Sequence, residues 1–291
     1  MPYKKIHVIT HRGLDPDRQD SPNGFPTESS KEAFQEHLNY GFGLEFDVNF
    51  TKDSQVVIFH DAGLKRISGG ESESLFVDLT AEEVRQLVLG QNNHFCFLQE
   101  LLPWLRQNPV AISALHLKGK FQSSKYLDIL VDFLSAFSDV FDRLIIFDVK
   151  IETAKYLKER LPRLSLAPSV AHDYDIERFN QCVSGTLLSV AEVLANKQLF
   201  SWVWLDEWDL VDRNDGQKKF YTKEVLENFK KEGFKIALVT PELHGTSPGL
   251  LGGEAHPDAV TSRLFQRIEE IISLEPDALC TDHPSRVRQM Y

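Results

Sequence analysis

Residues suited to acid–base and metal chemistry stand where three short apolar runs end. The first run ends in His11-Arg12-Gly13, the second contains Glu45 and Asp47, and the third ends in His60-Asp61. Two imidazoles can transfer protons, two carboxylates can hold a hard divalent cation, and a guanidinium can bind a phosphate. Cleavage of a phosphodiester uses all three kinds of group. Barrel enzymes carry such groups at the ends of their strands.

The two carboxylates lie on one face of a strand that we expect to be buried. Glu45 and Asp47 are two residues apart, so their side chains point the same way. A solvated strand face is the simpler alternative, but the neighbours Leu44, Phe46 and Val48 are apolar. A buried carboxylate pair is costly without a compensating cation. The pair therefore indicates a divalent-cation site.

The residues that follow each histidine favour a catalytic role over a place in the core. A lone histidine beside an apolar strand is most often a core residue. Here Arg12 follows His11 and needs an anionic partner, and Asp61 follows His60 and can orient its ring. Two histidines and an arginine at separate strand ends favour a catalytic site.

Apolar runs alternate with amphipathic stretches along the chain. Eight runs predict strands, over 6–10, 43–49, 110–117, 144–149, 164–170, 202–205, 235–240 and 277–281. Amphipathic spacing predicts helices over 29–40, 98–107, 125–137, 153–160, 175–183, 189–197, 223–232 and 263–274. Ser29 is expected to cap the first helix. This order predicts an α/β fold, the TIM (β/α)8 barrel.

A small insertion is expected after the second strand. The run 56–59 follows its predecessor after a short turn, so it predicts a hairpin partner. Residues 61–95 then form the insertion, with one helix over 81–89 in which Thr80 and Glu83 form a capping box. No linker or repeat interrupts the chain, which predicts a single domain over 1–291.

Composition narrows the possible partners. A chain of 291 residues with 42% hydrophobic content suits one barrel, and a net charge of −11 argues against nucleic-acid or anionic-membrane surfaces. The three cysteines are far apart, which favours reduced thiols. The sequence has neither a signal-peptide pattern nor an apolar run long enough to span a membrane. We expect a cytoplasmic protein that acts on a small molecule, and the sequence leaves its oligomeric state open.

Several motifs resemble the glycerophosphodiester phosphodiesterase family. The similarity covers nearly the whole chain, is specific in the first 61 residues and is looser over 62–275. The motifs are His11-Arg12-Gly13, Pro26-Thr27-Glu28-Ser29, Leu44-Glu45-Phe46-Asp47-Val48, Thr51-Lys52-Asp53, Val57-Ile58-Phe59-His60-Asp61 and Thr281-Asp282-His283-Pro284.

This resemblance implies a TIM barrel that cleaves glycerophosphodiesters to glycerol phosphate and an alcohol with the help of a divalent cation, Mg²⁺ or Ca²⁺. It implies that His11 and His60 form the general acid–base pair. It also implies attack by a neighbouring hydroxyl of the substrate, giving a cyclic phosphate that water opens. Arg12 and Lys118 are the expected phosphate contacts.

Two positions depart from the family pattern. The family usually has Glu-x-Lys on the third strand, and this chain has His116-Leu117-Lys118. His116 is then the expected third metal ligand beside Glu45 and Asp47, and an imidazole suits Mn²⁺ or Zn²⁺ better than Mg²⁺ or Ca²⁺. On the seventh strand the family's Trp-Thr-Val-Asn is replaced, and Glu242 is expected near the alcohol half of the substrate.

Three further residues are weaker candidates. Glu28 is expected to support a catalytic histidine or arginine, although the attraction of a glutamate to a helix N-terminus would also account for its position. Trp204 and Asp206 end the sixth strand and are candidates for the substrate pocket. A core tryptophan and a solvated acid are the alternative interpretation.

The sequence thus predicts a metal-dependent phosphodiester hydrolase. One alternative is a catalytically degenerate barrel that binds phosphorylated ligands, and another is a lyase that releases a cyclic phosphate. The alcohol group of the substrate, the preferred cation and the division of labour between the histidines stay open.

Overall fold

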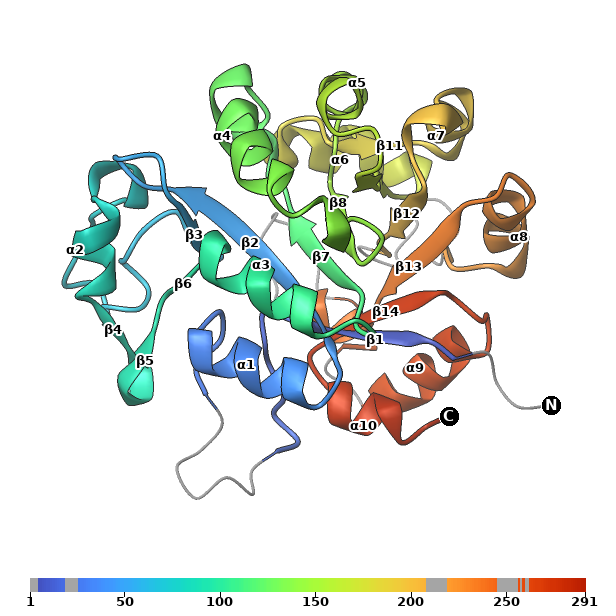
Figure 1. The fold of residues 1–291 in the computed structure, drawn as a ribbon. Coiled ribbons are helices and arrows are strands. Elements are labelled where there is room, and N and C mark those ends of the chain that lie inside the picture. Colours follow the sequence, from blue (N-terminus) through green and yellow to red (C-terminus); the bar gives the residue numbers. More distant parts are fainter. Residues whose placement is uncertain (1–4, 19–25, 208–218, 245–255, 257, 260–261) are drawn as a thin grey trace.

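A closed ring of parallel strands forms the centre of the molecule (Figure 1). The computed structural model describes residues 5–18, 26–207, 219–244, 256, 258–259 and 262–291. Around the ring the strands are β1 (His7–His11), β2 (Gly43–Phe50), β7 (Ser113–His116), β8 (Leu144–Phe147), β9 (Ser165–Leu166) with β10 (Ser169–Val170), β12 (Trp202–Leu205), β13 (Lys235–Val239) and β14 (Ala278–Thr281). β14 pairs with β1. The predicted α/β barrel is confirmed.

The ring closes through a strand that is broken in the middle. Residues 164–170 were expected to form one strand, but Pro168 has no N–H for the ladder and separates β9 from β10. Ala167 donates to Ile146 O at 2.9 Å, and Trp204 donates to Pro168 O at 3.1 Å. This segment therefore still joins β8 to β12. A further strand, β11 (Leu187–Leu188), pairs with β10 and is too short for its sequence pattern to reveal.

Helices cover the outside of the ring (Figure 1). They are α1 (Lys31–Asn39), α3 (Leu98–Gln107), α4 (Ser124–Ser135), α5 (Ile151–Arg160), α6 (Asp173–Val183), α7 (Val190–Ala195), α8 (Lys223–Lys231), α9 (Leu264–Ile272) and α10 (Pro284–Arg288). Short 3₁₀ turns span Phe76–Asp78, Gly90–Asn92, Gly119–Phe121, Ser138–Val140, Lys197–Leu199 and Pro241–His244. Among the described helices, none has the length and apolar content needed to cross a bilayer.

The first helix begins one residue later than expected. Ser30, not Ser29, is its N-cap, and the Ser30 Oγ accepts from Ala33 N at 3.0 Å. Ser29 has φ of +56°, and its N–H donates to Arg12 O at 2.7 Å. The chain thus turns at Ser29 to bind the loop after β1, which moves the cap along by one.

The insertion is built on a hairpin. β3 (Val56–Ile58) runs antiparallel to β2, as predicted, and β6 (Cys96–Phe97) pairs with β3. α2 (Ala81–Arg85) has the predicted capping box but is shorter than expected. The reason is that residues 88–94 form a second small hairpin, β4 (Val88–Leu89) with β5 (Asn93–His94).

Alternation along β2 places its two carboxylates inside the ring. Leu44, Phe46 and Val48 belong to the large cluster between strands and helices. Glu45 and Asp47 point the other way, toward the barrel interior. Both side chains are almost fully buried, with 3% and 1% of their surface exposed.

Candidate functional site

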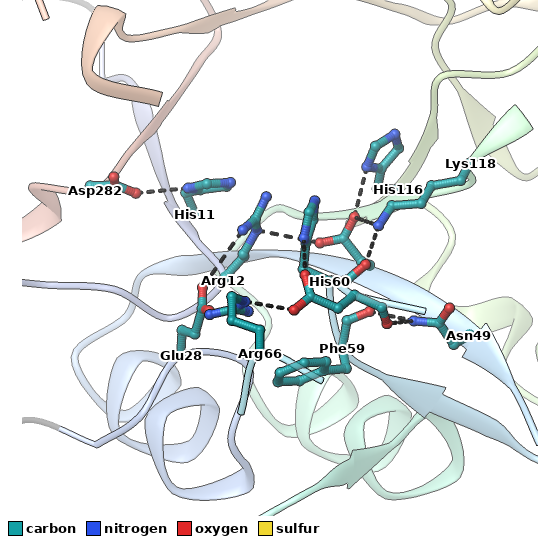
Figure 2. Close-up of polar contacts among 12 residues, drawn as sticks. His11, Arg12, Glu28, Asn49, Phe59, His60, Arg66, His116, Lys118 and Asp282 are labelled. Carbon is teal, nitrogen blue, oxygen red and sulfur yellow. Dashed lines mark hydrogen bonds and ion pairs between the residues drawn. The ribbon is translucent and has the colours of Figure 1, made fainter. Parts of the chain in front are cut away.

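The predicted histidines His11, His60 and His116 lie close together in Figure 2, and the predicted carboxylates lie at the same end of the barrel. His11 ends β1, Glu45 and Asp47 lie on β2, and His116 ends β7. Ligand atoms of Glu45, Asp47 and His116 lie within 4.8 Å of one another. His60 follows β3, the hairpin partner of β2. The topology thus brings together residues that are up to 105 positions apart.

Asp47 is the centre of the charge distribution. Lys118 Nζ lies 3.1 Å and His116 Nδ1 2.9 Å from its Oδ1, and Arg12 Nε lies 3.5 Å from its Oδ2. Burial alone would raise the pKa of Asp47, but these three partners hold it well below its usual range. Burial and the neighbouring Asp47 charge raise the pKa of Glu45.

The carboxylate pair fits a cation. Glu45 Oε2 and Asp47 Oδ2 are buried, and neither has a hydrogen-bond partner among the described residues. A buried carboxylate oxygen without a donor is costly unless a cation or water satisfies it. With an imidazole nitrogen of His116 they form a compact set of two oxygens and one nitrogen.

His116 is held on both sides of its ring. Nδ1 meets Asp47, and Nε2 lies 3.3 Å from Oδ2 of Asp148, which follows β8. Burial alone would lower the pKa of His116, but hydrogen bonds to Asp148 and Asp47 raise it to about 9. The ring stacks on Phe147 with centroids 4.7 Å apart, and Phe147 stacks on Trp204 at 4.0 Å. Trp204 is thus part of the barrel's inner core beneath the site.

His11 and His60 are each oriented by a carboxylate (Figure 2). His11 Nδ1 lies 2.8 Å from Asp282 Oδ1, and His60 Nδ1 lies 2.8 Å from Asp61 Oδ1. In both rings this leaves Nε2 for a substrate. Burial lowers the pKa of His60 to about 4, and Arg12 adds to this effect against the attraction of Asp47.

Glu28 links the phosphate-binding candidate to the second histidine. Its Oε2 lies 3.7 Å from Arg12 Nη1, and its Oε1 forms an ion pair with Arg66 Nη1 at 2.5 Å. Arg66 Nε in turn donates to Asp61 Oδ2 at 2.6 Å. The insertion therefore supplies a cation that fixes the carboxylate beside His60.

Glu242 lies at the expected strand end, where it bonds to the protein itself. Its Oε1 accepts from Thr240 Oγ1 at 2.6 Å, Thr281 Oγ1 at 2.6 Å and Asp282 N at 3.0 Å. It thus ties the ends of β13 and β14 together and places Asp282. Asp206 follows β12 at the same end of the barrel. Contact of Glu242, Asp206 or Trp204 with a substrate stays a prediction.

Two backbone turns aim these side chains. Arg12 has φ of +54° and Asp148 has φ of +65°, conformations that are uncommon outside glycine. Gly13 follows Arg12 with φ of +73°, and a Cβ there would meet Ala33 Cβ at 3.1 Å. Backbone strain of this kind is often found at functional sites.

Sequence reasoning missed the support that Asp282 gives to His11, and it missed Asn49 and Asp148. Asn49 continues the Glu45–Asp47 face of β2, and its Nδ2 donates to Phe59 O at 2.6 Å and Asp61 O at 2.9 Å. The period of two along β2 was an available signal. Asp148 also had one, because it is an acid near the end of the strand predicted over 144–149.

Comparison with known proteins identifies the family of this chain. Residues 11–286 match the Glycerophosphoryl diester phosphodiesterase family. The chain belongs to this family. A glycerophosphodiester phosphodiesterase from Caldanaerobacter subterraneus is 37% identical over 103 residues, which are 35% of this chain and 38% of that protein. The chain thus spans little more than a third of the length of this curated relative.

Solved structures of the family share the fold over the full length. A glycerophosphoryl diester phosphodiesterase from Parabacteroides distasonis superimposes with a TM-score of 0.66 at 17% identity, covering 100% of this chain and 87% of that one. A phosphodiesterase from Oleispira antarctica, solved with the product sn-glycerol-3-phosphate, gives 0.64 at 16% identity, with 98% and 96% covered.

Proposed function

We propose that this family member is a metal-dependent hydrolase that cleaves glycerophosphodiesters to a glycerol phosphate and an alcohol. The observation that carries the proposal is the arrangement of two carboxylate-oriented histidines around a buried carboxylate pair with unsatisfied oxygens. Family membership and the glycerol phosphate bound to the Oleispira enzyme support the substrate class.

Glu45, Asp47 and His116 would hold one divalent cation. When bound, the cation neutralises charge that develops on the phosphate oxygens. Arg12 and Lys118 lie beside Asp47 and supply positive charge to the same phosphate. Lys118 Nζ also donates to the carbonyl of His60, which fixes the ammonium close to that histidine.

The two histidines would move the protons. His60 is kept neutral by burial, so it can take the proton from the attacking hydroxyl through Nε2. His11 would donate a proton to the leaving alcohol oxygen as the neighbouring hydroxyl of the substrate forms a cyclic phosphate. The roles would then reverse, with His11 taking a proton from water and His60 returning one to the departing hydroxyl oxygen, which gives glycerol phosphate. Asp61 and Asp282 hold the opposite nitrogen of each ring and fix its direction.

Two substrates with different leaving groups test these roles. His11→Ala and His60→Ala should each lower turnover of glycerophosphocholine by 100-fold or more, a loss of about 10²–10⁴ being typical for a general acid or base. With glycerophospho-p-nitrophenol, whose leaving group needs no proton, only His60→Ala should stay impaired. His94→Ala, an exposed histidine paired with Glu32, is the control.

Several outcomes would contradict the proposal. Turnover within tenfold of wild type in both alanine variants would exclude the histidine pair. Equal recovery of both variants on the activated substrate would exclude the assigned roles. Phosphorus NMR of the products separates hydrolysis to glycerol phosphate from release of a cyclic phosphate.

A further inference from the structure

Asp148 is a buried carboxylate at the cation site that the steps above do not use. It follows β8, and 5% of its surface is exposed. Its Oδ2 lies 3.3 Å from Nε2 of His116, on the side of the ring opposite Asp47. Among the described residues, the ion-pair partner of Asp148 is His116, and no arginine or lysine is paired with it.

The turn that carries Asp148 is built to hold this position. Its φ of +65° turns the chain directly after β8. Gln122 Nε2 donates to Asp148 O at 2.7 Å and to Leu117 O at 2.8 Å, and Gln122 Oε1 accepts from Lys150 N at 3.0 Å. One side chain thus fixes the loops after β7 and β8 together. Gln122 therefore fixes the positions of His116 and Asp148 relative to each other.

We infer that Asp148 is a positioning residue of the cation site: by accepting a hydrogen bond from Nε2 of His116, it directs Nδ1 toward Glu45 and Asp47 as a metal ligand. A carboxylate on the second nitrogen is the common partner of a metal-binding histidine. The resulting oxygen and nitrogen set favours Mn²⁺ or Zn²⁺ over Mg²⁺ or Ca²⁺. This inference rests on the metal dependence in the proposed function.

A purely structural ion pair is the competing interpretation. In that case His116 would stay bound to both carboxylates when a cation is present, and the cation would have oxygen ligands only. The stack of His116 on Phe147 restrains the ring plane in either case. The two interpretations differ in one observable, which is a nitrogen ligand on the bound ion.

Manganese alone provides the test. Metal-stripped protein is titrated with Mn²⁺, free ion is counted by continuous-wave EPR, and pulsed EPR detects ¹⁴N coupling to bound Mn²⁺. Wild type should bind Mn²⁺ with one imidazole nitrogen. Asp148→Ala should weaken Mn²⁺ binding 10- to 100-fold, which is typical for loss of such a partner. Asp148→Asn, which keeps an acceptor oxygen, should lose less and retain the coupling.

The effect of Asp148→Ala in a His116→Glu background distinguishes positioning of His116 from general damage to the cation site. In His116→Glu the ligand set is all oxygen, so ¹⁴N coupling should vanish and Mg²⁺ should displace Mn²⁺ at lower concentration. Adding Asp148→Ala to this variant should lower Mn²⁺ affinity by much less than it does in the wild-type background, because no imidazole is left for Asp148 to orient. Asp142→Ala, an exposed acid just before β8, should match wild type.

The outcomes distinguish failure of this inference from failure of the proposed function. Bound Mn²⁺ without ¹⁴N coupling in wild type, or Asp148→Ala within threefold of wild type, overturns this inference and leaves the proposed function standing. Absence of Mn²⁺ binding overturns the inference together with the metal requirement. Turnover that persists in excess chelator would then show that the phosphodiesterase proposal holds without a cation.

Discussion

The two candidate catalytic histidines have the same support from different parts of the chain. Asp61, the next residue, holds His60, whereas Asp282, 271 residues away, holds His11. A carboxylate on Nδ1 fixes both the tautomer and the ring direction. Loss of that partner therefore disturbs proton transfer without removing the histidine.

Asp282→Asn should lower kcat roughly 10- to 100-fold, the usual effect of losing such a supporting partner. The amide can donate to Nδ1 and so stabilises the wrong tautomer. Steady-state kinetics on glycerophosphocholine measure this loss, and thermal unfolding should change little because Asp282 is partly exposed. Asp277→Asn makes the same chemical change just before β14, and its kcat is compared with that of Asp282→Asn. A kcat unchanged by Asp282→Asn would show that His11 needs no orientation.

His37 gives a prediction about acid stability. Its ring is fully buried in α1, where Nε2 donates to Gly13 O at 3.1 Å, and burial lowers its pKa from 6.5 to about 4. Between these values the unfolded chain binds a proton that the folded protein does not. Stability is therefore lost as pH falls from 6.5 toward 4, by up to about 3 kcal/mol at 1.36 kcal/mol per pKa unit.

Urea unfolding at pH 7 and pH 4.5 measures this effect. His37→Gln should be less stable than wild type at pH 7 but should lose less stability on acidification. Equal pH dependence in wild type and His37→Gln would contradict the assignment.

Residue types were readable from the sequence, but their conformations were not. Glu45, Asp47 and His60 were identified by their places at strand ends, and His116 was identified by its departure from the family pattern. The left-handed turns at Arg12 and Asp148 left no sequence signal, since neither is glycine. Those turns depend on tertiary contacts, such as the bond from Ser29 N to Arg12 O.

At the scale of elements, Glu242 joins the ends of two neighbouring strands. It accepts hydrogen bonds from Thr240 after β13 and from Thr281 at the end of β14. Its third bond fixes the backbone of Asp282, the partner of His11. Glu242 would therefore affect catalysis indirectly, by holding the ends of β13 and β14 and with them Asp282.

Glu242→Ala should therefore lower both stability and kcat. Removing the shared acceptor leaves the Thr281 hydroxyl and the Asp282 N–H without it, whereas Thr240 Oγ1 still lies 2.9 Å from Cys280 O. Each buried group left unsatisfied costs about 1–3 kcal/mol. Glu242→Gln keeps Oε1 and should retain most of both properties. Urea unfolding and steady-state kinetics measure the two effects. A Glu242→Ala variant that changes KM alone would instead place Glu242 against the substrate.

Element types followed well from periodicity, and their ends followed less well. The helix over 98–107 and the strand over 202–205 have the predicted bounds. The strand over 110–117 is shorter than expected, because only residues 113–116 pair with β8. Pairing partners decide where a strand ends, and they are not visible in a local pattern.

At the scale of the whole molecule, a buried ion pair connects distant segments of the chain. Arg267 Nη2 on α9 lies 2.8 Å from Glu207 Oε2, which follows β12, and both are almost fully buried. Glu207 Oε1 accepts from the backbone N–H groups of Phe220 and Tyr221. Burial would raise the pKa of Glu207, but His256 and Arg267 hold it at about 2.

Arg267→Met should destabilise the protein by about 3–5 kcal/mol, because it leaves the buried Glu207 charge without its guanidinium. Arg163→Met removes a solvent-exposed partner of Asp142 and should cost less than about 1 kcal/mol. The free energy of unfolding in urea compares the two. Similar small losses of stability in both variants would show that His256 and the backbone donors are enough to stabilise the buried charge of Glu207.

The barrel itself was predictable because eight strands alternate with helices, and alternation of this kind permits few folds. The site was predictable where its residues follow one another closely, as from His11 to His60. Asp282 and Asp148 were not recognised as parts of it. Asp282 reaches the site because the ring closes β14 onto β1, and Asp148 reaches it because β8 pairs with β7.

The stack of His116, Phe147 and Trp204 also makes the candidate cation site accessible to fluorescence. Trp204 is in the barrel interior, one ring away from the stacked imidazole, and is shielded from solvent. A change in the charge or tilt of His116 alters the field at the indole. Emission from Trp204, in a variant whose other tryptophans Trp104, Trp202 and Trp208 are replaced by phenylalanine, would therefore report on the site, and Phe147→Leu would interrupt that report.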